Sequence, residues 1–378
     1  MVSLMSLNEK VQITWSDLVI GRELPWDVYA ESGKLLLKAG HVIPNQQVLS
    51  SMQKYVMYRF ARDGDTAQTG KQKRINVFAL LDNLVLRLKN IYADIDAADQ
   101  NVPEKVEHLA KEIRQLCITE PDATIAAFHL PNEYRYSVFH SLQCAIVCAF
   151  ILQDENQDEH SQLMIIAAAL TANVGMHELQ DQLARQDGML TPDQDDEVKI
   201  HPEKSVRQLK NVGVSDKTWL QTILEHHELG NKTGYPRGLA LDEICAGAKM
   251  LAIADRYGAM VTMRDYRKPV FIKDALSMFL LDKGKSYDSR FALLLIKQLS
   301  IFPPGSFVKL NNGEVAIVIK RGMKNPMKPI VKSFLGPDKK RYIKPLFREC
   351  GVNNYEVDSL HGYDPNFPLN YHQIWDYA

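Results

Sequence analysis

Four histidines and one aspartate occur in the middle of the chain with the donor chemistry of a metal site. They are His140, His201, His226, His227 and Asp255. Imidazole nitrogen and carboxylate oxygen suit divalent first-row metals such as Fe, Mn, Zn and Ni, with little discrimination among them. A helical domain builds such a site by directing these groups inward from different helices. The set therefore predicts a site that could hold one divalent cation.

Taken singly, these residues have simpler explanations. A histidine on an apolar helix face is more often a hydrogen-bonded core residue than a ligand, and Asp255 could pair with an arginine. We expect His201 to open a helix ahead of Pro202. Two adjacent histidines on one helix point about 100° apart, so they could serve neighbouring metals, or a metal and a substrate.

A second group of residues could bind an anionic ligand. The sequence TGYPRGL at 233–239 predicts a rigid, exposed turn whose Tyr235 could stack on a base, be held by a partner protein, or only pack on its own domain. Arginines pair with phosphate oxygens through their forked guanidinium group. The candidate ligand-binding residues are Arg264, Arg267, Tyr235, Pro236 and Lys232.

The elements that must position these groups are mainly helical. Apolar residues recur at spacings of three and four from about Pro121 to Ser300, which predicts an all-α domain, and shorter alternating runs on both sides predict two small β-domains. We expect a β-rich domain over 1–62, a linker over 63–75, a helical hairpin or coiled-coil segment over 76–120, the helical domain over 121–301, a small basic β-domain over 302–348 and an irregular tail over 349–378.

Local patterns sharpen three of these expectations. Turns at Ser32-Gly33 and Asn312-Gly313 predict β-hairpins, and a short helix is expected from Asn45. The apolar seam between Val77 and Leu116 fits either a coil that forms a homodimer or two helices docked on the neighbouring domain.

Composition points to a soluble cytoplasmic protein without a membrane partner. The formal net charge is -1, and no apolar run approaches the roughly 20 residues of a membrane span. Nucleic acid is not an expected partner; the basic 302–348 segment predicts a solvated face, with an anionic partner as the alternative. The five cysteines, including Cys144 and Cys148 one helical turn apart, are expected to be buried reduced thiols.

Together the motifs resemble the HD-GYP family of the HD domain superfamily. They are His140-Ser141, His201-Pro202, HHE at 226–228, TGYPRGL at 233–239, IADRYGAM at 253–260 and RDYR at 264–267. Members of that family are metal-dependent phosphodiesterases that hydrolyse cyclic di-GMP in bacterial signal transduction. The resemblance covers roughly residues 130–270 and implies metal ligands at the four histidines and Asp255.

The resemblance also implies a degenerate centre. The family's His-Asp pair, aligned on Gly175, falls on Ala172 and Asn173, so no catalytic pair is intact. An aspartate in such a hydrolase holds two cations that share one water, which alanine and asparagine cannot do. The leading interpretation is a protein that binds cyclic di-GMP or a signalling partner with hydrolysis lost or weak. Residual hydrolysis through one metal, and a dimeric interaction module without ligand or metal, remain alternatives.

Overall fold

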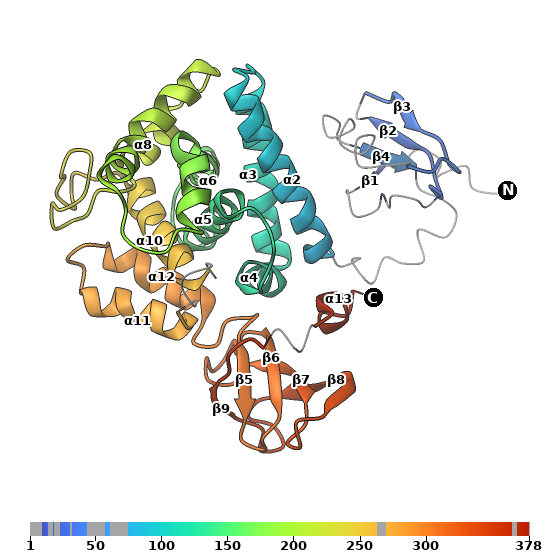
Figure 1. The fold of residues 1–378 in the computed structure, drawn as a ribbon. Helices are drawn as coiled ribbons and strands as arrows, with labels where there is room; N and C mark the ends of the chain where they lie inside the picture. The colour runs from blue at the N-terminus through green and yellow to red at the C-terminus, as the bar shows by residue number, and fades with distance from the viewer. Residues whose placement is uncertain are drawn as a thin grey trace. The chain divides into compact units, whose positions relative to one another are not determined.

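The computed structural model describes residues 10–13, 18, 23–30, 32–43, 57–60, 75–262, 270–364 and 369–377. The chain divides into two compact units, residues 1–83 and 84–378. Helix α2 (Val77–Asp96) crosses the boundary between them. Figure 1 colours the chain from blue at the N-terminus to red at the C-terminus and labels most of its helices and strands.

The first unit contains a four-stranded antiparallel sheet in the order β1-β4-β2-β3. Its strands are β1 (Lys10–Ile13), β2 (Val28–Ala30), β3 (Leu35–Leu37) and β4 (Met57–Phe60). Strands β2 and β3 form the expected hairpin, and Gly33 takes the positive φ of +82° that its turn requires. The helix expected from Asn45 lies outside the described residues.

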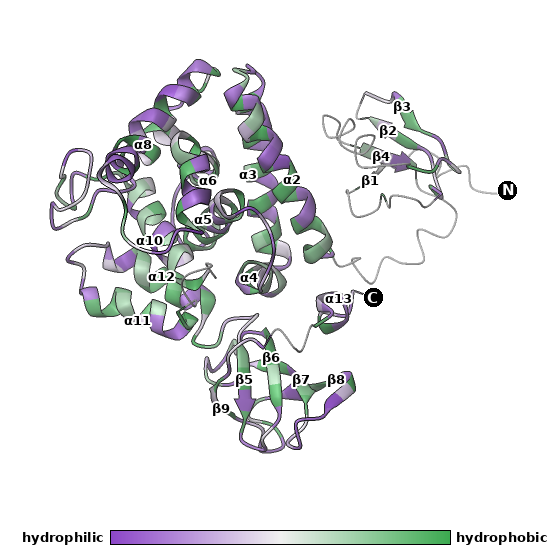
Figure 2. Cartoon of the chain, in the orientation of Figure 1, coloured by the Kyte–Doolittle hydropathy of each residue, from purple (hydrophilic) through white to green (hydrophobic). Residues whose placement is uncertain are grey.

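The second unit is dominated by helices around a central helix, α5 (Tyr136–Leu152), whose residues from Ser137 onward are buried. The others are α3 (Val102–Thr119), α4 (Pro121–His129), α6 (Glu159–Thr171), η3 (Val174–Met176), α7 (His177–Leu183), α8 (Pro192–Asn211), α9 (Lys217–Glu225), α10 (Ala246–Val261), α11 (Ile272–Asp282) and α12 (Ser289–Leu299). Figure 2 shows that α8 carries many hydrophilic residues, as expected of a helix that covers the domain. The predicted mainly helical fold is confirmed.

Helices α2 and α3 dock on this helical domain. Helix α3 packs against α5 and α6, and its apolar seam is buried within the same chain. From α2, Tyr92 donates a hydrogen bond to the Leu170 carbonyl oxygen at 2.9 Å. The packing of α3 and of α2 from Leu84 onward therefore agrees with the explanation of two docked helices.

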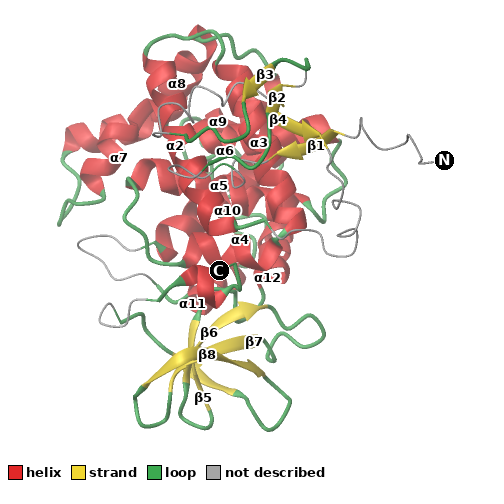
Figure 3. Ribbon diagram, turned by 90° about the vertical axis from the view of Figure 1, so that its right-hand side faces the viewer, coloured by secondary structure: helices red, strands yellow, loops and turns green. Residues whose placement is uncertain are grey.

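A five-stranded antiparallel sheet follows, in the order β8-β7-β6-β5-β9. Its strands are β5 (Phe307–Leu310), β6 (Val315–Lys320), β7 (Ile330–Leu335), β8 (Arg341–Glu349) and β9 (Val357–Leu360). Figure 3 distinguishes this sheet from the helices by colour. The turn between β5 and β6 uses Gly313 at φ +88°, as the Asn312-Gly313 pair predicts.

The expected irregular tail over 349–378 is wrong in part. Strand β9 pairs with β5, and Val357 and Leu360 pack on the core of the sheet. A short helix, α13 (Tyr371–Ile374), follows. The sequence obscured this continuation because four residues are too few to establish an alternating pattern.

None of the helices in the described part of the chain combines the length and apolar composition needed to cross a membrane.

Candidate metal centre

His201 lies inside α8, and the expectation that it opens a helix is wrong. The helix begins nine residues earlier, at Pro192, and its N-cap Thr191 forms a capping box with Gln194. Pro202 has no N–H to donate to the Val198 carbonyl oxygen. The His201 side chain takes this place, since its Nδ1 lies 2.5 Å from that oxygen. A proline is therefore tolerated within the helix because the neighbouring imidazole satisfies the free carbonyl.

This local bond fixes the state of the His201 ring. A carbonyl oxygen can only accept, so the proton of the neutral imidazole is on Nδ1 and the lone pair is on Nε2. His226 repeats the arrangement at the end of α9, where its Nδ1 donates to the Ile223 carbonyl oxygen at 2.6 Å. Both rings consequently present unprotonated Nε2 atoms.

These two Nε2 atoms face each other at 3.4 Å. Neither carries a proton, so no hydrogen bond joins them and their lone pairs repel unless a cation lies between. Two nitrogens bound to one tetrahedral ion at about 2.0–2.1 Å would be about 3.3–3.4 Å apart. His227 completes the group, since one donor atom from each of the three histidines lies within 4.8 Å of the others.

The charge state of this three-histidine group also suits a cation. Burial lowers the pKa of His201 to about 3, and burial likewise lowers the pKa values of His226 and His227. The buried Nε2 of His227 has no hydrogen-bond partner among the described residues. The rings are therefore neutral at physiological pH, which is the form that binds metal. The residues present fit a resident metal ion.

His140 and Asp255 form a second group beside the first. His140 Nε2 lies 2.8 Å from Asp255 Oδ1, and the Cys144 Sγ lies 3.6 Å from the same nitrogen. Burial opposes ionisation of Asp255, but the hydrogen bond from His140 and the nearby histidines hold its pKa far below the usual range. The five expected ligands thus come together, divided into two groups.

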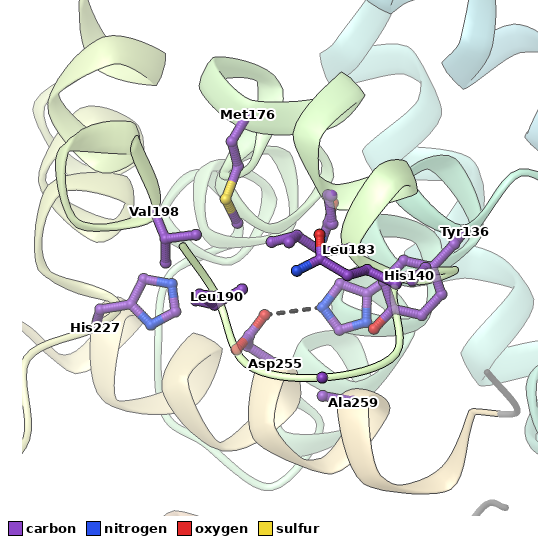
Figure 4. Close-up of a pocket in the computed structure, with 13 residues that line it drawn as sticks. Tyr136, His140, Met176, Leu183, Leu190, Val198, His227, Asp255 and Ala259 are labelled. Carbon is purple, nitrogen blue, oxygen red and sulfur yellow. Dashed lines mark hydrogen bonds and ion pairs between the residues drawn. The ribbon is translucent and has the colours of Figure 1, made fainter. Parts of the chain in front are cut away.

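Both groups border one cavity of about 270 Å³. Figure 4 shows the bonded pair His140 and Asp255 on one side, His227 on the other and Met176 above them. The remaining walls are largely apolar and include Leu183, Leu190 and Val198. An ion or a small anionic group could therefore reach His140, Asp255 and His227 from this side.

The 223–239 segment is organised by two glutamates that sequence reasoning did not select. Glu228 is buried and accepts backbone N–H groups of Arg237 at 2.6 Å and Leu239 at 2.9 Å. Glu225, also buried, accepts from the Arg237 guanidinium and from the Cys245 N–H. The signal available in the sequence was two acidic residues flanking the paired histidines in an otherwise apolar stretch.

Tyr235 is not displayed on an exposed turn. Its ring is half-buried and stacks on His227, with centroids 4.7 Å apart and planes 25° from parallel. Its backbone N–H donates to the His227 carbonyl oxygen at 3.1 Å, so its position depends on the same segment that carries the histidines. Lys232 is exposed and has a φ of +66°, whereas Arg264 and Arg267 lie outside the described residues.

Residues 172–175 lie directly against the turn of α8 that carries His201. The Ser205 hydroxyl donates to the Ala172 carbonyl oxygen at 2.7 Å and accepts the Gly175 N–H at 2.9 Å. A Cβ at Gly175 would lie 2.7 Å from the His201 carbonyl oxygen, so only glycine fits. Asn173 is buried, and its Oδ1 has no partner within the described ranges.

The chain is similar in sequence to an established protein family and to several characterised proteins. The model of the HD domain family matches residues 123–291. The chain is 26% identical over 267 residues to cyclic di-GMP phosphodiesterase PA4108 of Pseudomonas aeruginosa, covering 70% of this chain and 64% of that protein. It is 24% identical over 208 residues to cyclic di-GMP phosphodiesterase PdeB of Borreliella burgdorferi, covering 55% of each.

The chain is also similar in sequence to a phosphodiesterase named for a different cyclic dinucleotide, and in fold to one solved structure. The 3'3'-cGAMP-specific phosphodiesterase 3 of Vibrio cholerae is 25% identical over 211 residues, which is 56% of this chain and 45% of that protein. Bd1817, an HDG"Y"P protein from Bdellovibrio bacteriovorus, has a TM-score of 0.52 at 16% identity, covering 76% of this chain and 99% of that one. The latter similarity concerns the fold alone. The chain spans less than two thirds of the length of these curated relatives.

Proposed function

We propose that this chain, which belongs to the HD-GYP family, binds a divalent transition metal and cyclic di-GMP while hydrolysing the nucleotide weakly or not at all. The observation that carries the proposal is the pair of unprotonated Nε2 atoms on His201 and His226, facing each other at 3.4 Å. Two facing lone pairs repel each other in a hydrophobic core without an ion, whereas both can bind a cation that lies between them.

The three-histidine group supports the binding of one ion. Its rings are neutral, and those of His201 and His226 are buried and oriented by carbonyl oxygens of α8 and α9. Such outer hydrogen bonds are the usual means of fixing the tautomer of a metal-binding histidine. When bound, the ion would supply positive charge to a phosphate oxygen. The histidines hold it, and the cavity wall keeps bulk water away.

The 172–173 segment supports weak or absent hydrolysis. Asn173 lies beside the His201 turn, where the family's aspartate is expected, and its amide oxygen carries no negative charge. A neutral oxygen cannot offset the repulsion between two divalent ions that share a water molecule. Residual hydrolysis through a single ion is the competing function, and its test is product formation.

The ligand class rests on the named activities of the relatives together with the cavity. Two of the reported relatives are named for cyclic di-GMP and one for 3'3'-cGAMP, so the shared chemistry is a cyclic dinucleotide with two phosphodiesters. The cavity beside His227 and Asp255 is too small, at about 270 Å³, for a whole dinucleotide. We therefore place one phosphate there and the bases outside it.

Removing one imidazole should remove one ion. We expect His226→Ala to lower the number of Ni²⁺ ions retained per chain by one, because the group then has too few nitrogens to hold an ion tightly. Elemental analysis after metal loading and desalting measures this difference. His108→Ala, which changes an exposed histidine outside the group, is the matched control. Equal metal contents in all three proteins would contradict the assignment.

Cyclic di-GMP should bind without being cleaved. Calorimetric titration of the Ni²⁺-loaded protein is expected to give a saturable heat, and chromatography after the titration should recover the nucleotide intact. The His226→Ala protein should give a weaker heat, because the cation that attracts the phosphate is missing. Absence of heat with the metal-loaded protein would refute nucleotide binding, and linear products would instead support residual hydrolysis.

A further inference from the structure

A buried thiol belongs to the metal centre by position. Cys144 follows His140 by four residues on α5, so both side chains share one face of the helix. Its Sγ lies 3.6 Å from His140 Nε2. The donor atoms of His140, Cys144 and Asp255 all lie within 4.8 Å of one another.

We propose that Cys144 is a metal ligand and that it forms, with His140 and Asp255, a second cation site of mixed nitrogen, sulfur and oxygen donors. This inference rests on the proposed function only in taking the cavity to be a metal centre. The second site would bind a thiophilic divalent ion such as Zn²⁺ or Co²⁺ beside the ion of the three-histidine group.

The distances match such an ion. A zinc–nitrogen bond of about 2.0–2.1 Å and a zinc–sulfur bond of about 2.3 Å, at a tetrahedral angle, separate the two donors by about 3.6 Å. That is the spacing between His140 Nε2 and Cys144 Sγ. Asp255 Oδ1 is closer to the nitrogen, at 2.8 Å, because a hydrogen bond now joins them. Binding would replace this bond with two metal–ligand bonds.

Charge balance explains why sulfur matters in this centre. Asn173 contributes no charge where the family's aspartate is expected, so Asp255 is the one carboxylate among the expected ligands of two neighbouring cations. A Cys144 thiolate and the Asp255 carboxylate together supply two negative charges, enough for one divalent ion. The thiol proton leaves on binding and is released to solvent, as coordination of a thiol requires. The neutral His140 ring must also carry its proton on Nδ1 in place of Nε2, so that the Nε2 lone pair is available to the ion.

The donor set and the access route specify the class of ion. A thiolate favours Zn²⁺ and Co²⁺ over Mg²⁺ or Mn²⁺, which prefer oxygen ligands. His140 and Asp255 line the cavity, whereas Cys144 lies behind them in the core. An ion arriving through the cavity therefore meets the imidazole and the carboxylate before the sulfur.

Cobalt tests the site directly, because thiolate ligation to Co²⁺ produces a charge-transfer absorption in the near ultraviolet that imidazole and carboxylate ligands do not. Anaerobic titration of the reduced full chain should produce this band. Cys144→Ser should abolish it and lower the bound Co²⁺ by one ion per chain. Cys148→Ser is the matched control, one turn further along α5 and equally buried, and should retain the band.

Co²⁺ titration of the His226→Ala variant distinguishes this inference from the proposed function. That variant should bind one ion fewer per chain and still show the near-ultraviolet band. X-ray absorption spectroscopy at the zinc edge requires no variant. For the unmodified, zinc-loaded protein it should show a sulfur neighbour at about 2.3 Å from the metal. A spectrum with only nitrogen and oxygen neighbours would overturn the proposal. So would a cobalt band that survives Cys144→Ser or disappears in Cys148→Ser.

Discussion

Restoring both residues of the family's central pair, Ala172→His with Asn173→Asp, is expected to produce measurable hydrolysis of cyclic di-GMP. The other histidines and Asp255 already form two neighbouring donor groups, of which His140, His227 and Asp255 line one cavity, and the added carboxylate would supply the negative charge that two close cations require. The added imidazole would supply a further nitrogen donor. We expect a rate on the order of 100-fold or more above the unmodified protein, measured as linear product after loading with Mn²⁺ or Fe(II).

The two single substitutions are the informative controls. Groups that act as one catalytic unit show strongly non-additive effects, so Ala172→His alone and Asn173→Asp alone should each leave turnover near the starting value. An unmodified protein that already matches the double variant would show that residues 172 and 173 do not limit activity. A double variant that gains metal but no activity would assign part of the loss to Met176, Asn231 or Lys232, where the family resemblance implies a lysine, an aspartate and a glycine.

A methyl group at Gly175 is expected to disrupt the centre from outside its ligand shell. The new Cβ would lie 2.7 Å from the His201 carbonyl oxygen and 2.8 Å from the Ser205 backbone nitrogen. Both are backbone atoms of α8, so they cannot rotate away as a side chain would. Overpacking of this kind costs about 1–3 kcal/mol and occasionally more. We expect Gly175→Ala to lower the free energy of unfolding by about 3 kcal/mol.

The same substitution should weaken metal binding, because separating η3 from α8 displaces the turn that carries His201. Denaturant unfolding measures the first effect, and Ni²⁺ titration of the folded protein measures the second. Gly362→Ala is the control, since a Cβ there would meet no atom within 4 Å. Unfolding midpoints that agree for both variants would contradict the close packing described here.

The sequence by itself determined the class of fold and the chemical types of the site residues. Helical periodicity predicted the central domain, and the Asn312-Gly313 pair predicted the hairpin between β5 and β6. These inferences succeed because periodicity and turn chemistry are properties of neighbouring residues. The histidines and Asp255 were selected because few other side chains offer metal donors, and the structure brings all five to one cavity region.

Only the tertiary structure decided how those donors are presented. His201 lies within α8 and not at its start, because its ring bonds to the carbonyl that Pro202 leaves free. Cys144 reads as an ordinary core thiol until α10 brings Asp255 beside it. The need for glycine at 175 depends on α8, which begins 17 residues later in the chain. The His201 bond is local to α8, but the other two features are contacts between distant segments, and a linear pattern carries no information on the distance between their atoms.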